Sequence, residues 1–209
     1  MDSPKRDFDK EAAFWDTPPR MKLASDVACA ISAKLVLTPD MDVLDFGCGT
    51  GLVTLPIARQ VKSVTGVDSS RGMLDVLEEK TRQQKTGHIT ILHADLSQGG
   101  VLNGPYHALI SSMTLHHIKD TSGILKCFHQ AILKDGYIAL ADLDTEDGGF
   151  HENNDGVFHF GFDRAALGRL ITQAGFTDVC FTTAAQMHKP GPQGQERVFG
   201  VFLVTARKL

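Results

Sequence analysis

Short apolar runs alternate with longer stretches of helical periodicity through most of this chain. The runs are compact and almost unbroken, as in Val43-Leu44 and Ile138-Ala139-Leu140, which is typical of strands buried on both faces of a sheet. Because strands and helices alternate, we expect a mostly parallel sheet with helices on both faces. The strands are expected at 42–46, 63–67, 88–92, 106–111 and 136–143, and the helices between them at 51–61, 70–84, 97–101 and 119–132.

Both ends of the chain add elements to this core. Leu23, Val27, Ile31 and Leu35 repeat at helical spacing, which predicts a helix within 20–37 that lies on the sheet. Near the C-terminus a helix is expected over 163–174, because Asp163 can cap its start and Gly175 can end it. Two last strands are expected at 176–183 and 197–206, with a loop rich in proline and glycine at 184–195.

Two segments, 8–20 and 145–160, show neither a helical nor a strand period. Both would lie at the carboxyl edge of the sheet, where loops of α/β domains build substrate pockets. We therefore expect one domain over 1–209, with 1–37 as a helical N-terminal cover and 145–160 as an insertion at the active site.

Composition narrows the class of protein. The chain has 209 residues, of which 42% are hydrophobic, and this suits one domain with a sizeable core. The net charge is −4 and there is no block of Lys and Arg with interleaved aromatic residues, so nucleic acid is not expected as the main partner. No apolar run approaches the length of a bilayer span, and the start of the chain has no apolar signal-peptide region. The four cysteines form no C-x-x-C pair, so we expect a cytoplasmic protein without disulfides, and the sequence leaves its oligomeric state open.

The segment from Asp45 to Gly51, Asp-Phe-Gly-Cys-Gly-Thr-Gly, predicts a glycine turn between a buried strand and a helix. Gly47, Gly49 and Gly51 can adopt positive φ, and the lack of Cβ atoms lets a ligand approach the backbone. A nucleotide-type cofactor is the first interpretation. The fingerprint of NAD-binding domains requires a third glycine where this chain has Leu52, so an NAD-linked oxidoreductase is the weaker alternative.

This D-x-G-x-G-x-G pattern resembles motif I of the class I S-adenosylmethionine (SAM)-dependent methyltransferases, and the resemblance covers residues 38 to 209. It implies a Rossmann-like, seven-stranded sheet in the order 3-2-1-4-5-7-6, with strand 7 antiparallel. It also implies that the glycine turn wraps the methionine half of SAM. Asp45 would then lie under the ammonium group of the cofactor.

Acidic residues at the ends of the next two strands extend the resemblance. Asp68, followed by Ser69, matches the residue that accepts hydrogen bonds from the ribose hydroxyls, although either could be a helix N-cap instead. Asp95 matches the residue that binds the adenine amino group, and Leu96 would donate a backbone N–H to the ring; a plain turn aspartate is the alternative. Ser111, after the fourth strand, begins a stretch that looks like motif IV and completes the set of expected cofactor residues.

Histidines near the expected pocket are the candidates for catalysis. His116 and His117 follow the fourth strand and either could act as a general base, with pocket lining or packing as the alternative. The segment 150–160 holds two more histidines and several oxygen ligands, but its spacing matches no metal motif, so no metal site is predicted.

The sequence thus predicts a SAM-dependent methyltransferase that acts on a small molecule. A SAM-binding protein without transferase activity, serving as an assembly or regulatory partner, is the alternative from another functional class.

Overall fold

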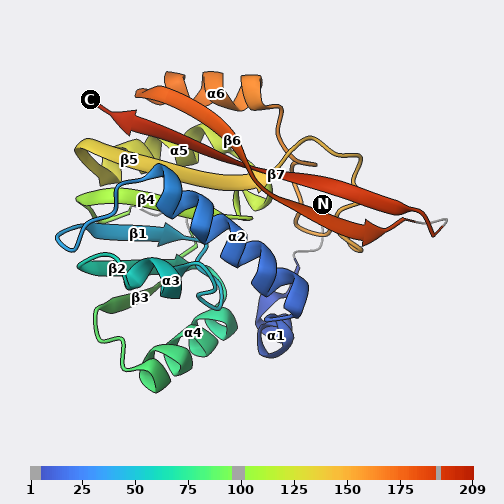
Figure 1. Ribbon diagram of the computed structural model, residues 1–209, viewed down its shortest axis with the longest axis horizontal. Helices are drawn as coiled ribbons and strands as arrows, with labels where there is room; N and C mark the ends of the chain where they lie inside the picture. Colours follow the sequence, from blue (N-terminus) through green and yellow to red (C-terminus); the bar gives the residue numbers. More distant parts are fainter. Residues whose placement is uncertain (1–5, 96–101, 192–193) are drawn as a thin grey trace.

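Seven strands form one sheet in the order β3-β2-β1-β4-β5-β7-β6 in the computed structural model, which describes residues 6–95, 102–191 and 194–209. Neighbouring strands from β3 to β5 are parallel, and β7 runs antiparallel to both β5 and β6. The predicted order and the antiparallel last strand are therefore confirmed (Figure 1). The strands are β1 Asp42–Phe46, β2 Ser63–Asp68, β3 Ile89–His93, β4 Tyr106–Ser112, β5 Ile132–Leu143, β6 Phe176–Pro190 and β7 Glu196–Lys208.

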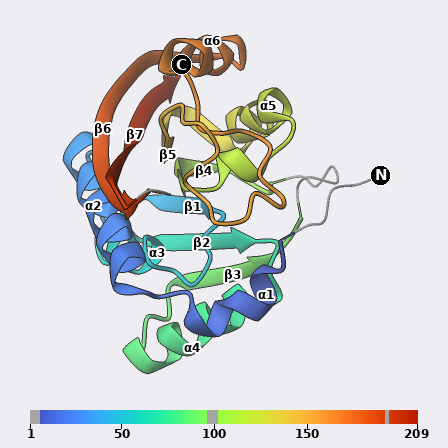
Figure 2. The same ribbon diagram turned by 90° about the vertical axis from the view of Figure 1, so that its right-hand side faces the viewer.

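Helices cover both faces of this sheet, as expected (Figure 2). One large apolar cluster includes side chains of α2, α3 and the sheet, and the other includes side chains of α5, α6 and the sheet. The central strands β1 and β4 are buried along most of their length because both clusters cover them. The helices are α1 Phe8–Glu11, α2 Pro18–Lys34, α3 Thr54–Ala58, α4 Arg71–Gln84, α5 Thr121–Ala131 and α6 Arg164–Gln173, with 3-10 turns η1 Ala12–Phe14 and η3 Leu115–His117.

The expected loop over 184–195 is wrong for its first half. Strand β6 continues to Pro190 and pairs with β7 from Ala185 opposite Val201 to Pro190 opposite Glu196. The two strands extend as an arm beyond the rest of the sheet (Figure 1). Pairing of neighbouring backbones forms this arm, and the proline and glycine content marks only its turn.

Two smaller differences concern helices near the glycine turn. The helix expected over 51–61 spans only Thr54–Ala58, because the turn continues beyond Gly51. The segment 8–20 contains the short helix α1, capped by Asp7, whose side chain accepts from the amide of Lys10. The helix expected at 97–101 lies outside the described residues. Among the residues that are described, no helix combines the length and apolar character needed to cross a bilayer.

Candidate active site

The glycine turn after β1 adopts the left-handed backbone that its sequence predicts. Gly47, Gly49 and Gly51 have φ values of +71°, +53° and +82°. A Cβ at Gly47 would lie 2.2 Å from Oγ1 of Thr114, and one at Gly51 would lie 2.3 Å from Cδ1 of Leu77. A Cβ at Gly49 would meet nothing within 4 Å. Packing therefore requires the outer two glycines, whereas Gly49 faces open space.

Asp68 ends β2 beside this turn and is held by two backbone amides. Its Oδ2 accepts from the N–H of Gly49 and its Oδ1 from the N–H of Ser70, each at 2.8 Å. Burial raises the pKa of this carboxyl group, and these hydrogen bonds act in the opposite direction. Helix α4 is capped by Ser70, whose hydroxyl accepts from the amide of Met73, and Ser69 is exposed. The N-cap alternative for Asp68 and Ser69 is therefore wrong.

Asp45 lies beneath the turn and is 1% exposed. The hydroxyl of Thr54 donates to its Oδ2 at 2.6 Å. Burial raises the pKa of Asp45 to about 7, against the effect of the Thr54 hydrogen bond, and the nearby carboxylate of Asp68 contributes in the same direction as burial. The carboxyl group can therefore gain or lose a proton near neutral pH.

The remaining predicted cofactor residues lie in or just after the neighbouring strands. Ser111 is 2% exposed, and its hydroxyl donates to the carbonyl of Phe46 at 2.7 Å, which joins β4 to β1. Asp95 lies two residues after β3 and is half-buried. Leu96 lies outside the described residues. The role of each in cofactor binding stays a prediction.

The N-terminal segment is tied to the same edge of the sheet. Asp16 accepts from the hydroxyl of Thr50 in the glycine turn at 2.6 Å and forms an ion pair with Lys80 of α4. Lys80 also donates to the carbonyl of Thr50 at 2.8 Å. Asp9 accepts from the hydroxyl of Ser70 and the amide of Gly72 at the start of α4. These contacts hold residues 8–17 over the turn.

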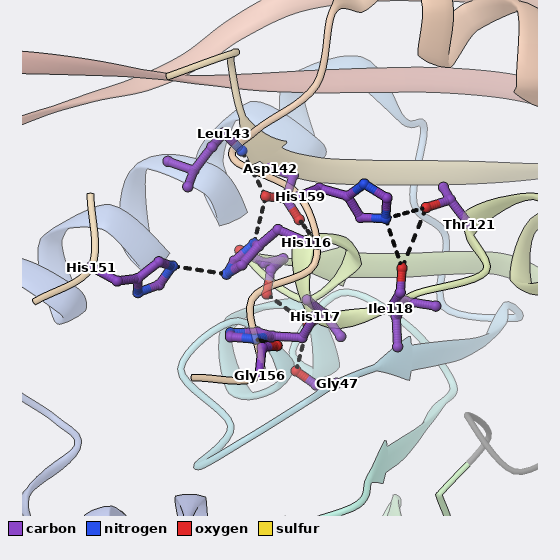
Figure 3. Close-up of polar contacts among 12 residues, drawn as sticks. Gly47, His116, His117, Ile118, Thr121, Asp142, Leu143, His151, Gly156 and His159 are labelled. Atoms are coloured by element: carbon purple, nitrogen blue, oxygen red, sulfur yellow. Dashed lines mark hydrogen bonds and ion pairs between the residues drawn. The ribbon is translucent and has the colours of Figure 1, made fainter. Parts of the chain in front are cut away.

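The two candidate bases belong to a cluster of three imidazoles (Figure 3). His116 is 1% exposed, and its Nδ1 is 2.7 Å from Oδ1 of Asp142. The Nδ1 of His117 donates to the carbonyl of Gly156 at 2.8 Å. His151, from the segment 145–160, brings its Nε2 to 3.2 Å from Nε2 of His116. The structure therefore unites both candidates with a histidine from the predicted insertion.

The environment of this cluster favours the uncharged form of His117 and of His151. Burial lowers the pKa of His117 to about 4 and that of His151 to about 3, and the neighbouring His116 acts in the same direction on both. Burial alone would raise the pKa of Asp142, but the imidazole of His116 and two backbone amides outweigh it and lower that pKa. Asp142 thus stands as a carboxylate beside His116.

Asp142 and His151 are the site residues that the sequence reasoning missed. Asp142 comes at the end of an apolar strand, which is the same signal that identified Asp45 and Asp68. His151 carried no comparable signal, because its segment has no periodicity and its partners lie 35 residues away along the chain.

Comparison with known proteins agrees with this geometry. The family model described as "Methyltransferase domain" matches residues 43–136, from β1 into β5. This stretch of the chain is thus similar to a methyltransferase domain. An uncharacterized methyltransferase of Schizosaccharomyces pombe is 31% identical over 120 residues, which cover 54% of this chain and 42% of that protein. The matched part of this chain thus spans less than half the length of that curated relative.

Solved structures share the fold of this chain. YcgJ of Bacillus subtilis superposes with a TM-score of 0.71 at 12% identity and covers 88% of this chain and 98% of its own. Phosphoethanolamine N-methyltransferase 2 of Haemonchus contortus, in complex with SAM, gives a TM-score of 0.69 at 16% identity and covers 88% of this chain and 52% of its own. At these identities the likeness concerns the fold alone.

Proposed function

We propose that the protein transfers the methyl group of SAM to a small-molecule acceptor. The observation that carries this proposal is the open space at Gly49 next to the carboxylate of Asp68, at the carboxyl edge of the sheet and within the stretch similar to a methyltransferase domain. The related fold of the Haemonchus enzyme, whose structure is a complex with SAM, supports the choice of cofactor.

The residues around Gly49 fit a ribose and a nearby polar chain. A carboxylate has about four acceptor positions, and Asp68 uses some of them for the amides of Gly49, Ser70 and Ser69. The remaining capacity can accept a hydroxyl of a ribose. The absence of a Cβ at Gly49 leaves the space that the cofactor would fill.

The other contacts follow from the resemblance. Asp45 would lie under the ammonium group, and Asp95 would bind the adenine amino group. Leu96 would donate a backbone N–H to the ring. Ser69 is exposed beside the proposed ribose site, whereas the hydroxyl of Ser111 already bonds Phe46 and would support the site by holding β4 against β1.

SAM supplies a methyl group that its sulfonium already activates for displacement. The protein then has to bind the acceptor, orient its nucleophilic atom and exclude water, and such positioning can lower a barrier by about 7–11 kcal/mol. Residues 8–17 cover one side of the site through Asp16, and the segment 145–160 contributes His151 on the other. Segments of the chain on both sides of the site favour a small acceptor over a macromolecule.

Calorimetric titration with SAM tests the cofactor assignment. We expect Asp68→Asn to weaken SAM binding at least tenfold, about 1.4 kcal/mol, because the amide group cannot accept all the hydrogen bonds of the carboxylate. Asp75→Asn is the matched control, since Asp75 lies on α4 and pairs with Arg71 at the surface. Equal affinity of Asp68→Asn and the wild type would contradict the ribose assignment.

The acceptor is sought in a second experiment. Purified protein is screened for a co-purified ligand, and then for formation of S-adenosylhomocysteine with a panel of metabolites. We expect SAM turnover with at least one small acceptor and none without it. SAM binding without turnover on any small or macromolecular acceptor would contradict transferase activity.

A further inference from the structure

Three histidines from two distant segments meet beside the proposed methyl-transfer site (Figure 3). His116 and His117 lie on η3, directly after β4, and His151 comes from the segment between β5 and α6. One nitrogen from each ring lies within 4.8 Å of the others. A cluster of three imidazoles with converging nitrogens suits a first-row transition metal such as zinc.

Two of these rings are held in the tautomer that a metal ligand needs. Asp142 accepts the Nδ1 proton of His116, and the carbonyl of Gly156 accepts the Nδ1 proton of His117. A neutral imidazole that carries its proton on Nδ1 presents a lone pair at Nε2. A carboxylate or backbone carbonyl behind each ring is the usual support for metal-bound histidine. The polar groups behind the cluster therefore orient the Nε2 lone pairs of these two rings in addition to holding the rings in place.

The distance between ring nitrogens in the cluster also fits a zinc site. Nε2 of His116 and Nε2 of His151 are 3.2 Å apart. Two nitrogens on a tetrahedral zinc ion, each about 2.0–2.1 Å from the metal, are about 3.3 Å apart. A nitrogen of His117 lies within 4.8 Å of the other two ligand atoms, so this ring would move closer to complete a set at zinc distances.

The surrounding charges allow a cation. The carboxylate of Asp142 is fully buried against His116. Two cations, Arg6 and Lys189, act on His151. The guanidinium of Arg6 donates to Nδ1 of His151 at 3.5 Å and is paired with Glu11 through hydrogen bonds of 2.7 and 2.6 Å. With His151 bound through Nε2, Nδ1 would carry the proton, so Arg6 would give up its 3.5 Å contact with Nδ1 and keep its pairing with Glu11.

We propose that His116, His117 and His151 bind a divalent transition-metal ion, Zn²⁺ in the first instance, and that its open position takes a hydroxyl or thiol of the methyl acceptor. The second part rests on the proposed function. Three histidine ligands leave a fourth position free, as in catalytic zinc sites. This site departs from the sequence expectation of no metal, which considered only the spacing within 150–160.

The location gives such an ion a role in methyl transfer. Thr114, two residues before His116, donates to the carbonyl of Gly47, so η3 adjoins the glycine turn. Metal coordination lowers the pKa of a bound hydroxyl or thiol, which releases its proton to solvent. The oxygen or sulfur anion then forms a bond to the methyl carbon while the carbon–sulfur bond of SAM breaks and its electron pair returns to sulfur. The products are the methylated acceptor and neutral S-adenosylhomocysteine.

Metal binding by the full chain tests the site directly. Protein stripped with a chelator is titrated with Zn²⁺ by calorimetry and with Co²⁺ by visible absorption, which distinguishes four-coordinate cobalt from the hydrated ion. We expect one ion per chain, and at least a roughly 100-fold loss of affinity in His151→Ala, which removes one ligand. His159→Ala is the matched control, because His159 lies in the same segment but contacts Thr121 and Ile118. Absence of binding, or equal affinity in His151→Ala and the wild type, would overturn the site.

A second variant and a SAM titration separate this proposal from the proposed function. Asp142→Asn is expected to weaken Zn²⁺ binding about 10–100-fold, since it removes the support of His116 without removing a ligand. SAM titration of the stripped protein and of both variants reports on folding and on the cofactor site. SAM binding without any metal binding would overturn the metal site alone, and metal binding without SAM binding would overturn the cofactor assignment alone. Full activity of the stripped protein, lost in His116→Ala, would overturn the metal's role and favour His116 as a general base.

Discussion

Gly49 offers a substitution whose effects on folding and on cofactor binding can be separated. Gly49 has φ +53° and no atom within 4 Å of a Cβ built on it. Gly194, at the turn of the β6–β7 arm, has φ +79° and equally open space. Valine at either position would suffer the same kind of backbone strain, about 1–3 kcal/mol. Only at Gly49 would its side chain also fill the space assigned to SAM.

The expected outcome is a similar loss of stability in both variants and a loss of SAM binding in one. We expect Gly49→Val to lower SAM affinity at least 100-fold, about 2.8 kcal/mol, and Gly194→Val to leave it within twofold of wild type. Thermal unfolding gives the stability of each variant, and calorimetry gives the affinity. If Gly49→Val unfolds at the assay temperature, Gly49→Ala with Gly194→Ala as its control repeats the comparison with less strain. A folded Gly49→Val variant that binds SAM as well as Gly194→Val would refute the placement of the cofactor.

Three further predictions concern the surroundings of the site. The pKa of Asp45 in the free protein is raised to about 7, and the ammonium group of bound SAM would lower it, so SAM binding should release a proton. The affinity for SAM should therefore rise from pH 6 to pH 7 and level off above about pH 8. Calorimetry in two buffers measures the proton release, which Asp45→Asn should abolish. Lys80→Met should loosen residues 8–17 from the glycine turn and cost about 1–2 kcal/mol, seen as faster amide exchange in that segment, and unchanged exchange would count against the cover. Phe128→Ala should lower the free energy of unfolding by about 3–5 kcal/mol in denaturant titrations, because Phe128 is fully buried against Phe46, and a loss below 1 kcal/mol would show that the core repacks.

The sheet could be predicted from sequence because its central strands carry their own signal. Strands buried on both faces are continuous apolar runs, and those at β1, β4 and β5 stand out from the helical segments around them. The outer part of β6 carries no such signal, because its polar residues lie on an arm where β7 is its only neighbour in the sheet. Pairing between strands distant from the core depends on the partner, and composition alone does not reveal it.

The candidate site, like the sheet, has one part that the sequence predicts and another that it does not. The glycine turn, Asp45 and Asp68 lie at the carboxyl ends of strands, so topology alone brings them to one edge of the sheet. His151 reaches His116 only because its irregular segment folds back over that edge, where Lys189 of the arm donates to the carbonyl of Phe150. The same folding leaves Phe158 and Phe160 about half exposed. Contacts made by a segment without periodicity cannot be derived from its sequence.

A crystal structure of the protein with S-adenosylhomocysteine tests the central claim most directly. The account predicts that the ribose hydroxyls bind Asp68 and that the amino-acid end lies along the turn at Gly49, above Asp45. An empty edge at saturating ligand, or the ligand bound elsewhere on the molecule, would contradict it.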